Sequence, residues 1–392
     1  MGAVGALRTG FVGTRGEVLR LSLITACITS ATLGLYRSWM KTRLRQWYWS
    51  SVNIGGQPFE YSGTASEKFL GFLVAISFLT FYLAVVNVLL MSGSIALLYT
   101  AYGAYILSVI GLLPVVLYAR YQGWRYIVNR TAWRGVRFQM APGGFRFMLL
   151  GLRYLGASIL TLGFLFPRAA FELQKFENEN ISYGDAPFRQ GGDASLLKPA
   201  WRYGQIAVAA NLAVVLAALL INRDALYALW LTVPAWLAAW AYFRAERFRL
   251  MTSALRAGGM AFRSDLDAVA VTKRFMIGSI IVFAILALLY TYGRSAFEGR
   301  LDALSYTELL AFNRDAAEQR LFILSIFAYA CFLYVLWSVL SHLLIKLPMA
   351  RLFAESVSIE GAEGLDRVRQ VEMQTTLAAD GLLEVLDLGP GI

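Results

Sequence analysis

Charged side chains are scarce in this sequence. They make up 16% of the 392 residues, whereas hydrophobic residues make up 58%. Soluble globular domains are about one quarter charged. Here the apolar residues gather in long blocks, and the mean hydropathy is +0.56. This composition excludes an ordinary soluble domain and predicts an integral membrane protein.

Histidine and cysteine are nearly absent, with one histidine and two cysteines. Cys27 and Cys331 lie inside apolar blocks, which indicates buried apolar residues and not a disulfide framework. His342 has no other histidine or cysteine near it in the sequence, which disfavours a zinc or haem site. The sequence contains no P-loop, nucleophile elbow or HExxH motif. We therefore expect no enzymatic activity, no catalytic residue, no cofactor and no bound metal.

The net charge of +11 comes from 36 basic and 25 acidic residues. Either nucleic acid or anionic lipid could explain such a balance. In a membrane protein, lysine and arginine gather in cytoplasmic loops and favour anionic head groups. We therefore expect the lipid bilayer, with its anionic head groups, as the partner and no nucleic acid, and a homo-oligomer is left open.

Eight apolar blocks can be distinguished along the chain: 21–36, 69–90, 94–118, 147–166, 203–221, 225–242, 275–292 and 321–344. The intervening segments 37–68, 119–146 and 243–274 are basic, so all three are predicted to be cytoplasmic. If every block crossed the membrane, 119–146 and 243–274 would lie on opposite sides. This conflict disappears if blocks 21–36 and 147–166 do not cross. The first of these is short, and the second carries Arg153 near its middle, which is costly in a spanning helix.

Two sequence echoes indicate a partial internal duplication. Thr32-Leu33-Gly34 recurs as Thr161-Leu162-Gly163, and further matches keep the same offset. A shorter Gly-x-x-Phe echo recurs in the predicted cytoplasmic segments, at Gly56–Phe59, Gly135–Phe138 and Gly259–Phe262, with Asp185–Phe188 as a degenerate copy. Its glycine suits a tight turn, and its phenylalanine could dip into the membrane interface.

The stretch from Thr32 to Thr64 resembles the YjgN-like family of bacterial inner-membrane proteins, a domain family of unknown function. The residues that carry the resemblance are Thr32, Leu33, Gly34, Tyr36, Trp39, Lys41, Arg43, Arg45, Phe59, Tyr61, Gly63 and Thr64. The second copy departs from the pattern: it has Phe164 to Phe166 and Pro167 where the first copy has Leu35 to Arg37 and Ser38, and it lacks the tryptophan. The resemblance implies a location in the bacterial inner membrane and implies no activity.

The first basic segment provides most of the candidate site. On a helix, Arg37, Lys41 and Arg45 share one face, and Arg43 and Trp39 lie at the same level. These residues are candidate contacts for an anion or a lipid head group. The alternative is plain anchoring by a positive, aromatic interface belt. Arg153 is a further candidate if its helix crosses the membrane, whereas in an in-plane helix it could extend to the interface.

The sequence therefore predicts an all-α integral membrane protein. It would have six spanning helices in three hairpins, two short re-entrant or in-plane helices, and both termini in the cytoplasm. The predicted divisions are a first repeat (1–128), a second repeat (129–270), a third hairpin (271–345) and a cytoplasmic tail (346–392). The leading functional hypothesis is a passive or facilitated transporter or channel for a small solute or lipid. The alternative is a membrane protein that binds anionic lipid or docks a cytoplasmic partner without transport.

Overall fold

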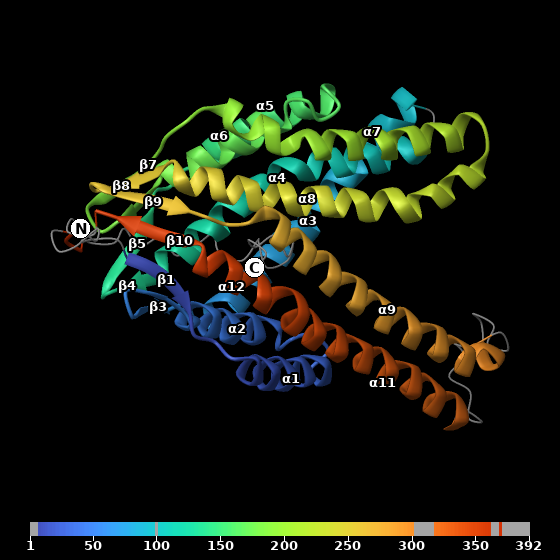
Figure 1. Cartoon of the computed structure of the whole chain (residues 1–392). Helices are drawn as coiled ribbons and strands as arrows, with labels where there is room; N and C mark the ends of the chain where they lie inside the picture. The colour runs from blue at the N-terminus through green and yellow to red at the C-terminus, as the bar shows by residue number, and fades with distance from the viewer. Residues whose placement is uncertain (1–6, 99–100, 302–316, 362–367, 371–392) are drawn as a thin grey trace.

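The computed structural model describes residues 7–98, 101–301, 317–361 and 368–370. Within them, short strands gather at one end of the molecule, and helices extend away from that end (Figure 1). Strands and helices alternate along the described residues, so distant parts of the sequence contribute to both layers.

The strands form a closed antiparallel barrel with the order β1-β10-β9-β8-β7-β6-β5-β4-β3-β2. Each strand is only three to five residues long. Their bounds are β1 Leu7–Phe11, β2 Val52–Ile54, β3 Gln57–Tyr61, β4 Thr131–Trp133, β5 Val136–Met140, β6 Ile181–Tyr183, β7 Ala186–Gln190, β8 Leu255–Ala257, β9 Met260–Ser264 and β10 Val357–Glu360. Because β1 pairs with both β2 and β10, the first and last described strands close the barrel.

Tight glycine turns explain how strands this short can pair. Gly55 and Gly56 join β2 to β3 with φ angles of 56° and 84°, and Gly258 and Gly259 join β8 to β9 with 53° and 88°. Two successive positive φ angles are typical of the two-residue hairpin turn whose twist matches that of the strands. The Gly-x-x-Phe echo therefore corresponds to β-hairpins, and its phenylalanine lies in the second strand of each.

Aromatic side chains fill the interior of the barrel. The rings of Phe59 and Phe138 lie 6.2 Å apart, those of Phe138 and Phe188 6.4 Å, and those of Phe188 and Phe262 5.7 Å. Each of these pairs joins strands that another strand separates, so the rings must meet inside the barrel. Trp133 pairs with Phe59 across β3 and β4 and belongs to the same buried cluster. The barrel centre is thus a packed core.

The helices follow the strands in successive pairs. Their bounds are α1 Arg15–Ala31, α2 Arg37–Ser51, α3 Ala65–Leu98, α4 Ala101–Asn129, α5 Gly144–Leu160, α6 Phe166–Glu179, α7 Lys198–Leu220, α8 Leu229–Ser253, α9 Ala268–Leu301, α11 Ala317–Leu340 and α12 Leu347–Glu355, with short helical turns η1 Ala194–Leu197, η2 Arg223–Ala228 and η3 Ser341–Lys346. Neighbouring pairs touch: α2 contacts α3, α4 contacts α5, η1 contacts both α6 and α7, α8 contacts α9, and α11 contacts α1. The pairs therefore form a closed ring above the barrel.

The two Thr-Leu-Gly segments form the same backbone turn. Leu33 and Gly34 have φ angles of 52° and 90°, and Leu162 and Gly163 have 50° and 87°. In both turns the threonine hydroxyl accepts a backbone N–H four residues later, at 3.1 Å and 3.2 Å. Each turn follows a 17-residue helix, α1 or α5, and reverses the chain, which returns toward the barrel as α2 or α6. The shared geometry explains the repeated residues, and the duplication itself stays a prediction.

The prediction of an all-α fold is wrong, because a β-barrel closes one end of the molecule. Six spanning helices are not found either. In the described residues, four helical segments are long and apolar enough to cross a membrane: Ala194–Leu220, Arg223–Ser253, Ala268–Glu298 and Arg320–Glu355. The strands were not predicted because they are too short to show alternation, and six of them lie in the basic segments 37–68, 119–146 and 243–274 that we assigned to loops.

Candidate binding site at the junction of barrel and helices

An apolar cavity of about 220 Å³ lies where the barrel meets the helices. We call it the barrel cavity. Strands, helix ends and aromatic rings all contribute to its wall: Trp49, Phe59, Trp124, Ile127, Val128, Thr131, Phe138, Asn178, Ile181, Phe188 and Leu255. Pockets for drug-sized ligands hold roughly 300–1,000 Å³. The barrel cavity therefore suits a small apolar molecule or one end of a chain.

Beside this cavity lies a group of polar and charged residues that we call the junction cluster: Arg45, Tyr61, Glu67, Lys68, Tyr126 and Arg130. Lys68 is only 5% exposed. Its Nζ donates to Thr42 Oγ1 at 3.1 Å and lies 5.0 Å and 5.8 Å from the ring centres of Tyr61 and Tyr126. Aromatic faces attract a desolvated cation, which offsets part of the cost of burying it.

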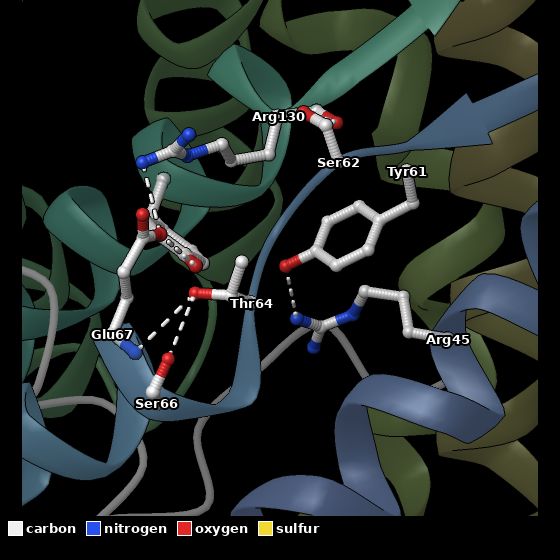
Figure 2. Close-up of polar contacts among 8 residues, drawn as sticks. Arg45, Tyr61, Ser62, Thr64, Ser66, Glu67 and Arg130 are labelled. Atoms are coloured by element: carbon white, nitrogen blue, oxygen red, sulfur yellow. Dashed lines mark hydrogen bonds and ion pairs between the residues drawn. The ribbon is translucent and has the colours of Figure 1, made fainter.

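Arg45 points into the cluster from α2 (Figure 2). Its Nη1 donates to the Tyr61 hydroxyl at 3.4 Å, and its guanidinium lies 5.5 Å from the Tyr61 ring centre and 6.0 Å from that of Trp49. Within the described residues, Arg45 has no carboxylate partner. Its positive charge is therefore not neutralised by a described acid.

Glu67 and Arg130 form the other side of the cluster, as Figure 2 shows. Their ion pair measures 2.9 Å, and the Tyr126 hydroxyl donates to Glu67 at 3.1 Å. Burial, with added contributions from Tyr61 and Glu67, raises the pKa of Tyr126, so its hydroxyl keeps the proton that it donates. Thr64 Oγ1 accepts the Glu67 N–H at 3.4 Å and begins α3 in the manner of an N-cap residue.

The predicted site residues do not all meet at one place. Arg37, Trp39, Lys41, Arg43 and Arg45 do lie on one helix, α2. Of these, Arg45 belongs to the junction cluster, whereas the exposed Arg43 lies over the Tyr36 ring at 5.9 Å. Trp39 stacks on Tyr36 and also touches Phe69. Arg37 is exposed and Lys41 is partly buried.

Arg153 lies far along α5, is exposed, and is 5.5 Å from the ring centre of Tyr154. None of these placements tests whether the predicted residues bind an anion, and that role stays a prediction.

Sequence reasoning missed Lys68 and the tyrosines around it. The signal was one lysine immediately before the long apolar block 69–90, four residues after Thr64. A charge placed there needs a partner, and Tyr61 was already part of the family pattern. The barrel cavity had no local signal, because residues from position 49 to position 255 form its wall.

The described residues contain no group of three or more His, Cys, Asp or Glu that could hold a metal ion. His342 is buried, with its Nδ1 2.7 Å from the Ser338 carbonyl oxygen and its ring stacked on Tyr48 at 6.4 Å. Its environment is that of a packed core residue.

A family model described as "Bacterial protein of unknown function (DUF898)" matches residues 6–385. The chain belongs to this family. Inner membrane protein YjgN of Salmonella typhimurium is 26% identical over 129 residues, which is 33% of this chain and 30% of that protein. Inner membrane protein YjgN of Escherichia coli O157:H7 is 27% identical over 128 residues, 33% of this chain and 29% of that protein.

The resemblance seen in residues 32–64 is thus confirmed at the level of the family. The alignments cover less than a third of either YjgN protein, so they carry no statement about the whole length of those proteins. No solved structure matches the chain.

Proposed function

We propose that this protein resides in the bacterial inner membrane and binds an anionic amphiphile at the junction of barrel and helices. The apolar part of the ligand would occupy the barrel cavity, and its charged group would contact Arg45 and Lys68. One observation carries the proposal. Trp49 lines the barrel cavity and also faces the Arg45 guanidinium, so the apolar and cationic regions share a wall.

The electrostatics of the junction cluster support an anionic ligand. Glu67 already pairs with Arg130, whereas the guanidinium group of Arg45 contacts Tyr61 and Trp49 and no described carboxylate. Guanidinium groups bind phosphate and carboxylate oxygens with two parallel hydrogen bonds, which makes Arg45 a suitable head-group contact. No step of chemical catalysis is part of the proposal.

The inner-membrane location rests on the names of the two YjgN relatives and on the four apolar helices. We propose that the barrel faces the cytoplasm. Its outward-pointing strand residues include five exposed arginines: Arg8, Arg137, Arg189, Arg256 and Arg263. Arginine-rich segments resist translocation, which favours the cytoplasmic side. Because β1 and β10 both belong to the barrel, both chain termini would then be cytoplasmic.

The test measures the lipids that copurify with the full-length chain in a non-ionic detergent. We expect wild-type protein to retain an anionic lipid in a fixed ratio and Arg45→Gln to retain about tenfold less, because one charge-assisted contact contributes roughly 1.5 kcal/mol. Arg189→Gln is the control, since Arg189 is an exposed arginine on strand β7, outside the cluster and outside the predicted contacts. Equal retention by the two variants would refute the proposal.

Facilitated passage of a small solute or lipid is the second candidate, and the closed ring of helix pairs above the barrel favours it. Such passage would require the aromatic barrel core to move, in the way that hydrophobic constrictions gate channels. Flux into proteoliposomes tests it. Phe188→Ala should raise the flux if the core is the barrier, and Arg153→Leu should lower it if Arg153 lines the path. No change in either variant would speak against transport.

A further inference from the structure

A second, smaller cavity lies higher in the helical layer, among α4, α5, α6 and α8. Its volume is about 70 Å³, and its wall consists of Arg120, Leu155, Phe166, Ala170, Leu173 and Arg247. We call it the arginine pocket. It shares no residue with the barrel cavity. A water molecule needs about 10–15 Å³ of such space, so the pocket has room for one small polyatomic ion.

The positive charge around this pocket exceeds the negative charge. Arg120 pairs with Glu177 at 2.8 Å and lies 5.6 Å from the Phe147 ring centre. Arg247 lies within electrostatic range of Arg120 and Glu177, so a second guanidinium group adjoins the ion pair that Arg120 already forms. In the part of the chain that the structure describes, no ion pair joins Arg247 to an acid.

The position of Arg247 makes this excess costly. It lies six residues before the end of α8 at Ser253 and is partly buried between the helices. Arg120 lies nine residues before the end of α4 at Asn129, so both arginines are about 9–14 Å from the barrel ends of their helices. Both arginines are partly buried, and a charge removed from water is costly unless it has a partner of opposite sign, a hydrogen bond or a water molecule. Two guanidinium groups that line one small cavity provide the donor set for an oxyanion.

We propose that the arginine pocket binds one small oxyanion between Arg120 and Arg247. The anion is a phosphate group, either free inorganic phosphate or the head group of a lipid. This site is independent of the junction cluster, and Arg45 has no part in it.

The experiment follows thermal unfolding of the full-length chain in non-ionic detergent as inorganic phosphate is added, with sodium chloride matching the ionic strength. We expect a saturable rise in the midpoint for wild type and at least a tenfold higher half-saturating concentration for Arg247→Gln. Ala170→Val keeps every charge but fills part of the pocket, so it should also raise the half-saturating phosphate concentration. Arg256→Gln changes an exposed arginine on strand β8, outside the pocket, and should behave as wild type.

A second arm distinguishes the two sources of phosphate. The same variants are unfolded in nanodiscs of phosphatidylglycerol and of phosphatidylcholine without added phosphate. If phosphatidylglycerol nanodiscs, and not phosphatidylcholine nanodiscs, stabilise wild type more than Arg247→Gln, the ligand is a lipid head group. If inorganic phosphate in detergent stabilises wild type more than Arg247→Gln, the ligand is the free ion. If Arg247→Gln does not fold, Ala170→Val decides. Wild-type response of both pocket variants, or no stabilisation in either arm, overturns the proposal.

Discussion

Replacing Phe138 by alanine should destabilise the protein by about 3 kcal/mol. The Phe138 ring lies 4.8 Å from Tyr183, 6.2 Å from Phe59 and 6.4 Å from Phe188, measured between ring centres. Truncating a buried phenylalanine costs roughly 3–5 kcal/mol. We take the lower end, because Phe138 is partly buried and one side of its ring borders the barrel cavity.

The assay is urea unfolding in non-ionic detergent, followed by tryptophan fluorescence. Arg137→Ala is the matched control, because Arg137 precedes Phe138 on β5 and points to the exposed outer face. Its free energy of unfolding should stay within about 0.5 kcal/mol of wild type. If the two variants were equally stable, the Phe138 ring would not belong to a packed barrel core, and the barrel interior would have to be reassigned.

Three further predictions concern single positions. Leu162→Gly should raise the free energy of unfolding by about 0.5–1 kcal/mol. Leu162 has a φ of 50°, a conformation that costs a non-glycine residue roughly 1–2 kcal/mol. A neutral or destabilising effect in urea unfolding would argue against the turn. Thr64→Ala should lower the free energy of unfolding by about 1 kcal/mol through loss of the cap of α3, with Thr64→Ser, which keeps the capping hydroxyl, as the comparison. Burial raises the pKa of Tyr183 from 10.0 to about 12, so its contribution to stability is complete below pH 10 and lost as the pH approaches 12. Tyr183→Phe should remove that part of the pH dependence in unfolding measurements, and an unchanged profile would exclude the buried phenol as its source.

The helices could be anticipated from hydropathy, whereas their grouping could not. The apolar blocks at 203–221 and 225–242 correspond to α7 and α8, because long apolar runs carry a strong local signal. Charge asymmetry also identified the basic segments 37–68, 119–146 and 243–274, each of which contains two barrel strands. It could not show that these segments contain strands, because β2, β4 and β8 have only three residues each.

The candidate site was predictable only in part. Arg45 was identified from its helical spacing with Arg37 and Lys41, and the structure places all three on α2. The spacing could not reveal that Arg45 turns toward Tyr61, since that contact depends on how β3 packs beside α2. Lys68 was missed because a single lysine at the edge of an apolar block resembles an ordinary interface residue.

The barrel cavity and the arginine pocket depend entirely on tertiary structure. Arg120 and Arg247 are 127 positions apart in the sequence and carry no shared motif. The Gly-x-x-Phe echo did mark four hairpins, but we interpreted its phenylalanine as an interface residue. The structure shows that these rings point into a closed barrel, where each contacts a ring two strands away.

The most direct test of the proposed binding site is photo-crosslinking from inside the barrel cavity. A diazirine amino acid is placed at Ile181, which lines the cavity, or at Ser182, the next residue on β6, whose side chain points to the opposite face. After illumination of intact membranes, mass spectrometry identifies the attached molecule. We predict a covalent adduct of an anionic lipid or amphiphile at position 181 and none at position 182. No adduct at 181, or the same adduct at both positions, would contradict the account.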